Sequence, residues 1–187
     1  MSHKFEQSLI DLCSPTLAGI KVGSVFLYTI DKNENLHKTI TYWNMKLSKK
    51  GLHICLIKER YNGGLVYVFR PAMLNILLTN KEIKLFLQSR GFKTSTKLEV
   101  YIEQLQYCFY NKSSFPHEIG IFLGYPLKDV KGFIEHSGKN FTLCGFWKVY
   151  GEPKLAQKMF SRYQKCLNIY KQIFEKNYDI LYLTVTT

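Results

Sequence analysis

The tetrapeptide Tyr61-Asn62-Gly63-Gly64 constrains the fold of this 187-residue chain most strongly, because it joins two short runs rich in β-forming residues. These runs span 53–59 and 65–70, and Pro71 ends the second one. Asn-Gly between such runs is the strongest short-range signal for a β-hairpin, since both central residues of that turn take a positive φ. The middle of the chain therefore predicts an antiparallel strand pair over about 53–70.

Helical periodicity and further strand-like runs surround this hairpin. We expect helices at 3–13, 33–47, 72–78, 80–89, 95–110, 116–124, 127–136 and 153–176, and further strands within 17–30, 141–150 and 181–185. Pro15 is expected to end the first helix, Asp31 to cap the second, and Ser114 to cap the one at 116–124. Strands mixed with clusters of helices favour an α+β fold, in which a small, mostly antiparallel sheet packs against several helices and a long C-terminal helix.

Length and apolar content indicate a single globular domain over residues 1–187, because 46% of the residues are apolar and 15% are aromatic. The longest apolar runs, such as 65–69, are far shorter than the ~18–20 residues of a membrane helix. The first residues also lack the apolar core of a signal peptide. The five cysteines are widely spaced, with no Cys-x-x-Cys pair, which favours reduced thiols. These features predict a cytoplasmic protein without membrane association.

The formal net charge of +12 makes nucleic acid the first partner class to consider. Most of the basic residues are lysines scattered along the chain, and no basic run is longer than Lys49-Lys50. Scattered lysines usually form a solvated surface, although dispersed charges can still converge in space. Nucleic-acid binding therefore stays an open alternative that the sequence does not favour.

The segment 115–129 is dense in residues that packing alone does not require. Its His117 and Glu118 stand where a helix should begin, so they are either first-turn residues that suit the helix dipole or a general base oriented by a carboxylate. With Cys13 as nucleophile they would make a thiol-dependent enzyme. Cys13 also fits a buried structural thiol, because its neighbours at helical spacing, Phe5 and Leu9, are apolar.

Two further interpretations depend on segments that converge in space. Cys144 and Cys166 fit core positions, but together with Cys13 and His117 they could form a thiolate–imidazole metal site. The short helices around Gly124-Tyr125-Pro126 allow a helix-turn-helix, yet 127–136 lacks a face rich in Arg, Asn and Gln, which favours an ordinary helical corner. No phosphate-binding loop, dinucleotide fingerprint or zinc-protease helix occurs, so standard nucleotide and metalloprotease chemistry has no positive support and the cofactor stays unknown.

Basic and aromatic residues recur together in several segments, and this pairing carries the favoured functional hypothesis. The residues are the cations Lys21, Arg70, Lys148 and Lys165 and the aromatics Tyr125, Trp147 and Tyr150. Guanidinium and ammonium groups suit an anion, and aromatic rings suit the wall of a pocket. We therefore expect a pocket for a small anionic or aromatic ligand, with Lys21, Arg70 and Lys148 facing one cavity. The alternative is solvated charges beside a packed aromatic core.

Three longer segments carry a resemblance to a known family. They are 13–21 (Cys-Ser-Pro-Thr-Leu-Ala-Gly-Ile-Lys), 115–130, which ends Gly-Tyr-Pro-Leu-Lys-Asp-Val, and 144–150 (Cys-Gly-Phe-Trp-Lys-Val-Tyr), and Tyr163-Gln-Lys-Cys166 fits as well. Together they resemble an uncharacterised family of anaerobic Gram-positive bacteria, domain of unknown function 3793. The resemblance covers nearly the whole chain and implies a single stand-alone bacterial domain. It implies no activity, cofactor, oligomeric state or catalytic residue.

Overall fold

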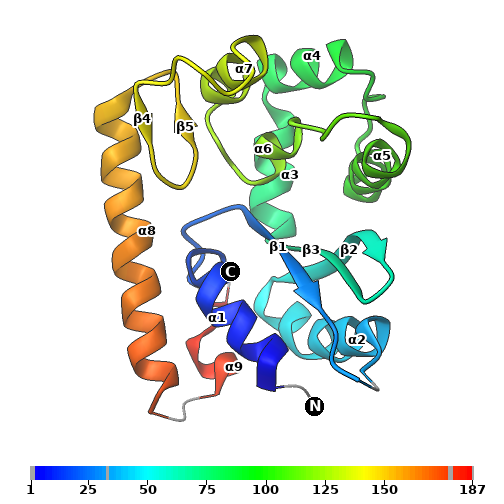
Figure 1. The fold of residues 1–187 in the computed structure, drawn as a ribbon, viewed down its shortest axis with the longest axis vertical. Helices are drawn as coiled ribbons and strands as arrows, with labels where there is room; N and C mark the ends of the chain where they lie inside the picture. The colour runs from blue at the N-terminus through cyan, green and yellow to red at the C-terminus, as the bar shows by residue number, and fades with distance from the viewer. Residues whose placement is uncertain (1–2, 33, 177–178, 187) are drawn as a thin grey trace.

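A three-stranded antiparallel sheet lies at the centre of the computed structural model, which describes residues 3–32, 34–176 and 179–186 (Figure 1). Its strands are β1 (Gly23–Thr29), β2 (His53–Arg60) and β3 (Gly63–Phe69), in the order β1-β3-β2. Phe69 of β3 pairs with Gly23 on one side and with His53 on the other. The expected hairpin and the α+β class are therefore confirmed.

The turn of this hairpin differs from the expected one. Arg60 pairs with Gly63, so Tyr61 and Asn62 form the turn, and neither has a positive φ. The positive φ of 142° belongs to Gly63, where a Cβ would lie 1.9 Å from the carbonyl oxygen of Tyr28. Gly63 is thus required by the close approach of β1 rather than by an Asn-Gly turn.

Side chains alternate between the two faces of the sheet, and helices cover both faces. Val66 and Val68 of β3 lie in the core of one face. The helices of that layer are α1 (His3–Leu17), α2 (Leu36–Leu47), α9 (Ile180–Leu183) and the C-terminal part of α8 (Pro153–Phe174). Tyr67 and Phe69 lie in the core of the other face. Its helices are α3 (Pro71–Thr79), α4 (Lys81–Ser89), α5 (Leu98–Asn111), α6 (Ile119–Phe122) and α7 (Leu127–Glu135).

A second, two-stranded sheet packs on the N-terminal half of α8. Its strands are β4 (Leu143–Cys144) and β5 (Lys148–Val149), and they pair in antiparallel fashion. Trp147 and Val149 share a small core with Ala156 and Tyr163 of α8. Figure 1 shows α8 along one side of the molecule, with one end beside this hairpin and the other near α9. Within the described residues, no helix is both long and apolar enough to cross a membrane.

Pro15 does not end the first helix, because α1 continues to Leu17. Proline removes one main-chain donor, and the helix tolerates that loss so close to its C-terminal end. In the same turn the hydroxyl of Ser14 donates to the carbonyl of Ile10. The extended run expected from residue 17 accordingly begins only at Gly23.

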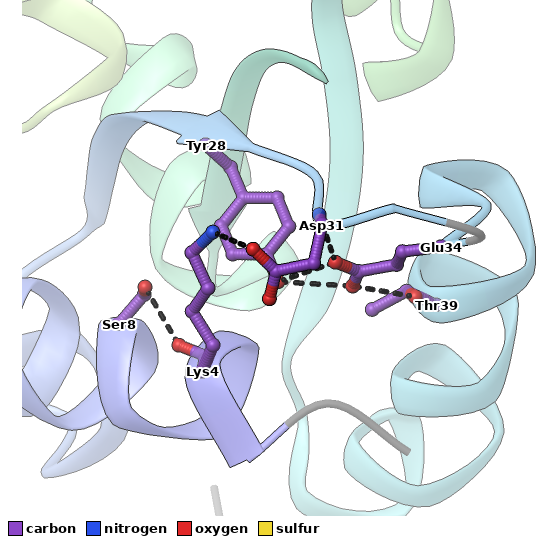
Figure 2. A network of polar contacts seen from close by, with 6 residues as sticks. All are labelled: Lys4, Ser8, Tyr28, Asp31, Glu34 and Thr39. Atoms are coloured by element: carbon purple, nitrogen blue, oxygen red, sulfur yellow. Dashed lines mark hydrogen bonds and ion pairs between the residues drawn. The ribbon is translucent and has the colours of Figure 1, made fainter. Parts of the chain in front are cut away.

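The second helix is capped by Asn35, whose side-chain oxygen accepts from the amide of Lys38 at 3.0 Å. Residue 33, where this helix was expected to begin, lies outside the described residues. Figure 2 shows that Asp31, the expected cap, instead pairs with Lys4 of α1 at 2.6 Å. In the same network Glu34 accepts from the hydroxyl of Tyr28 at 2.9 Å. These contacts fasten the β1–α2 connection to α1.

Three other expectations about local structure are wrong. The helix expected at 116–124 is the single turn α6, which has no side-chain cap, so Ser114 does not cap it. The strand expected at 141–150 is the β4–β5 hairpin, because the chain reverses around Gly145 and Trp147. The strand expected at 181–185 is helix α9, whose first turn is capped by the Asp179 carboxylate. The short α6 also lacks the length of the first helix in a helix-turn-helix.

Candidate ligand-binding site

A cavity of about 320 Å³ lies among β1, α6, α7 and the β4–β5 hairpin. Its lining comprises Val25, Phe115, His117, Ile119, Gly120, Leu123, Tyr125, Asp129, Val130, Phe133, Cys144, Gly145, Trp147 and Lys148. Most of these side chains are apolar, and a few polar groups stand among them. Small-molecule sites have this character and volumes of roughly 300–1,000 Å³. The cavity is therefore the size of a small-ligand site.

One wall of the cavity is a pair of stacked aromatic rings. The rings of Tyr125 and Trp147 lie 4.9 Å apart at 28°, and Phe160 of α8 packs edge-on against Trp147 at 4.5 Å. The Tyr125 hydroxyl donates to the carbonyl of Phe146, and burial raises the pKa of Tyr125 to about 12. The ammonium group of Lys21 lies 5.5 Å from the centre of the Tyr125 ring. Contacts from α8, the hairpin and the segment before β1 therefore hold this wall in place.

The buried carboxylate of Asp129 fixes the hairpin to α7. One oxygen accepts from the indole nitrogen of Trp147 at 2.7 Å. The other accepts from the main-chain amides of Tyr150 at 2.8 Å and Gly151 at 2.6 Å. Both oxygens are thus engaged in holding the site together. The sequence interpretation missed Asp129, because an acidic residue in the first turn of a helix is usually explained by the helix dipole alone.

Lys148 and His117 are two further polar residues of the cavity lining. The Lys148 ammonium donates to the carbonyl of Gly138 at 2.8 Å and lies 4.9 Å from the ring centre of Phe141. The His117 ring packs 4.8 Å from the ring of Phe133. An ammonium group has three donor hydrogens, so Lys148 can also donate to a ligand. Because the Asp129 carboxylate is engaged, the charge that the cavity offers to a ligand is positive.

The expected Cys13–His117–Glu118 constellation does not assemble. His117 lines the cavity, whereas Glu118 is fully buried and pairs with Arg90 at 2.7 Å and with Lys112 at 3.2 Å. Cys13 is fully buried in α1, in the core on the opposite face of the sheet. Burial raises the pKa of the Cys13 thiol to about 12, so this thiol is protonated at neutral pH. A cysteine nucleophile needs the opposite shift.

The four residues of the possible metal site also lie apart. Cys144 is exposed and lines the cavity, as His117 does, whereas Cys166 lies on α8 and Cys13 lies in the other core. Over residues 3–32, 34–176 and 179–186, no group of three or more His, Cys, Asp or Glu side chains is arranged to hold a metal ion.

The rate of alkylation should distinguish the thiols of Cys13 and Cys144. We expect iodoacetamide at neutral pH to modify Cys144 quickly and to leave Cys13 unmodified, because Cys144 is exposed whereas Cys13 is buried and has a raised pKa. Peptide mass spectrometry over a time course gives both rates, and labelling in urea supplies the control in which both thiols are accessible. Folded protein in which Cys13 reacts as fast as Cys144 would restore the nucleophile hypothesis.

Arg70, expected at the ligand pocket, is a fully buried structural residue. Its Nε donates to the carbonyl of Thr16 at 2.6 Å, and one terminal nitrogen donates to the carbonyls of Leu17 at 2.5 Å and Val185 at 2.8 Å. The other terminal nitrogen donates to the carbonyl of Lys50 at 3.3 Å. The guanidinium therefore joins the end of α1 to the C-terminal segment and to the turn after α2.

Lys21, Arg70 and Lys148 therefore do not face one cavity, contrary to the expectation. Lys21 is buried and donates to the carbonyl of Gly23, and burial lowers its pKa to about 8. Only Lys148 of the three lines the cavity, while Lys21 lies behind its aromatic wall. All three ammonium or guanidinium groups bond to main-chain carbonyls, a use of charge that strand-end positions in a sequence do not reveal.

The two remaining expected ligand residues lie outside the cavity lining. Tyr150 stacks on His136 at 5.6 Å, beyond the end of α7. Lys165 is exposed on α8 and lines a separate shallow groove. The cavity thus unites three of the seven expected ligand residues, Tyr125, Trp147 and Lys148, with His117 from the expected catalytic set.

Glu118 should make the stability of the fold sensitive to acid. Burial alone raises the pKa of this carboxyl, but main-chain hydrogen bonding together with Arg90 and Lys112 outweighs it, so the pKa lies below the ordinary value of 4.5. The ionised Glu118 carboxylate therefore stabilises the fold fully above the pKa that it has in the unfolded chain. This stabilisation is lost as pH falls through its lower pKa in the folded protein. We expect Glu118→Gln to reduce the loss of stability below about pH 4.5, measured by urea unfolding.

The exposed Glu103 provides the matched control for this measurement. Glu103→Gln should leave the acid dependence as in the wild type. If Glu118→Gln also leaves that dependence unchanged, the buried ion pairs do not lower the carboxyl pKa.

A family described as "Protein of unknown function (DUF3793)" matches residues 9–184, a range that contains every residue of the cavity. No curated protein and no solved structure matches the chain. The family match agrees with the resemblance of the segments 13–21, 115–130 and 144–150. The chain therefore belongs to the DUF3793 family of proteins of unknown function.

Proposed function

We propose that this protein binds a small, flat ligand that carries an anionic group, within the cytoplasm of a bacterial cell. The observation that carries the proposal is that the stacked Tyr125–Trp147 pair and the side chain of Lys148 line one cavity of about 320 Å³. The cytoplasmic and bacterial parts rest on the spacing of the cysteines and on the sequence resemblance. The cavity supports the ligand class.

The chemistry of the lining favours an anion over a cation. Lys148 is the cationic side chain of the lining, and Asp129 uses both of its oxygens to hold Trp147, Tyr150 and Gly151. A ligand ammonium group would therefore meet the Lys148 charge without a free carboxylate to compensate for it. A carboxylate or phosphate would instead accept a charge-assisted hydrogen bond from Lys148.

The lining also favours binding over catalysis by thiol chemistry. Glu118 is directed at Arg90 and Lys112 and does not orient His117. Cys13 is buried in the other core. What remains at the cavity is an apolar, aromatic enclosure with a positive charge, which suits recognition of a planar acid.

A thermal-shift experiment with matched probes tests the proposal. We expect 1-naphthoate and phenyl phosphate to raise the melting temperature, and the neutral 1-naphthamide to raise it much less. Lys148→Met should abolish the preference for the acids, and Lys148→Arg should retain part of it. The control Lys81→Met removes one charge from an exposed position of α4 and should change nothing. Equal shifts for naphthoate and naphthamide, or a preference that survives Lys148→Met, would contradict the proposal.

A further inference from the structure

The charged side chains of helix α8 are all basic, and none of them lines the cavity. Its 22 residues include five basic side chains and no acidic one. The basic residues are Lys154, Lys158, Arg162, Lys165 and Lys171, and all five are exposed. Ala156 and Tyr163 are the buried residues of this helix and point into the protein. The helix therefore turns its cations to solvent.

Four of these cations form one stripe. Lys154, Lys158, Arg162 and Lys165 are spaced by four, four and three residues, which places them on a single helix face. At ~1.5 Å of rise per residue the stripe extends over roughly 16 Å. Among the ion pairs of the described residues, the one that involves α8 joins Lys171 to Asp11, so no carboxylate pairs with a member of the stripe.

A shallow groove runs beside this stripe. Its lining comprises Gly145, Phe146, Phe160, Ser161, Gln164, Lys165, Asn168, Ile169 and Gln172. Phe146 and Phe160 are partly exposed aromatic rings at the hairpin end of the groove. Along the helix the polar residues are a hydroxyl and three amides, which can both donate and accept hydrogen bonds. Nothing in this groove carries a negative charge.

We propose that this face of α8 binds single-stranded nucleic acid, with phosphates on the four-residue stripe and bases against the groove. A row of unpaired cations attracts a phosphate backbone, and partly exposed aromatic rings beside it can stack on unpaired bases. The side-chain amides of the groove suit the polar edges of those bases. The four basic residues of the stripe are separated in the sequence, but the helix brings them together on one face.

The arrangement argues against a membrane surface as the occupant. A helix that lies in a membrane interface inserts its apolar face into the lipid. The apolar face of α8 is instead packed against the β4–β5 hairpin and α1, where Tyr163 lies in the interior. The side left to solvent carries the cations and amides with two exposed apolar residues, Leu155 and Ile169, which do not make an apolar face for insertion into lipid.

Fluorescence anisotropy with labelled oligothymidylate tests this inference. The variant Lys158→Gln/Arg162→Gln/Lys165→Gln should weaken binding by about tenfold or more and lower the dependence of log K on log salt by about 2, since each lost phosphate contact contributes ~0.7. The control Lys81→Gln/Lys93→Gln/Lys97→Gln removes the same net charge from exposed positions around α4 and α5. It should weaken binding far less. Thermal melts establish that both variants fold.

Four outcomes would overturn the inference. They are equal weakening by the two triple variants, unchanged affinity of the α8 variant, tighter binding of a duplex of the same length, and binding of phosphatidylserine vesicles or polyglutamate without binding of oligothymidylate. The cavity variant Lys148→Met should bind oligothymidylate normally, so failure of this proposal is distinguishable from failure of the small-ligand proposal.

Discussion

Replacing Arg70 with methionine is expected to lower the free energy of unfolding by about 3–5 kcal/mol, because a fully buried cation that donates to several main-chain carbonyls is removed. The carbonyls of Thr16, Leu17 and Val185 would lose their charged donor inside the protein. Methionine fills part of the volume but donates no hydrogen bond. Urea unfolding followed by circular dichroism measures the difference.

The exposed Arg60 offers a control for this substitution. Arg60→Met should change stability by less than about 0.5 kcal/mol, as expected for an exposed position. Arg70→Lys should remain strongly destabilising, because one ammonium cannot reach the same set of carbonyls as the guanidinium fork. An Arg70→Met protein as stable as the wild type would show that the guanidinium does not hold the end of α1.

Replacing Asp129 with alanine is expected to cost about 3 kcal/mol and to abolish binding in the cavity, since three hydrogen bonds to one carboxylate are lost together. Trp147, Tyr150 and Gly151 would lose the acceptor that holds the hairpin on α7. The aromatic wall would then lose its fixed position. Hydrogen exchange should show faster exchange at the amides of Tyr150 and Gly151, while the amides of β3 stay protected at early times.

Asp129→Asn provides the comparison, because an amide keeps one acceptor oxygen but carries no charge. Its effect should be intermediate in stability and in exchange rate. Uniform faster exchange throughout the chain in Asp129→Ala would mean that the carboxylate supports the whole fold rather than the hairpin.

The sequence predicted the secondary structure best where periodicity was long and a turn signal was strong. The hairpin at about 53–70, the apolar face of α5 and the length of α8 agree with the structure. Gly63 shows the limit of such local signals. Its conformation is dictated by Tyr28 of the neighbouring strand rather than by the turn that Asn62-Gly63 suggests. Short aromatic runs such as 141–150 do not distinguish a strand from a tight hairpin.

The sequence predicted the types of residue that form the candidate site, but not which individual residues line it. Tyr125, Trp147 and Lys148 come from two short segments in which basic and aromatic residues recur together, and both segments line the cavity. Arg70 and Cys13 could not be assigned, because burial depends on which side of the sheet α1 covers. Asp129 was missed for a similar reason, since its partners lie at the end of a hairpin that the sequence suggested was a single strand.

Protection of Cys144 from alkylation tests the central claim most directly. Cys144 lines the cavity, and Cys166 on α8 lies outside it and serves as an internal reference. If 1-naphthoate occupies the cavity, saturating 1-naphthoate should slow the reaction of Cys144 with iodoacetamide and leave the rate at Cys166 unchanged. If 1-naphthoate raises the melting temperature while Cys144 reacts as fast as before, the ligand binds elsewhere and the cavity is not the site.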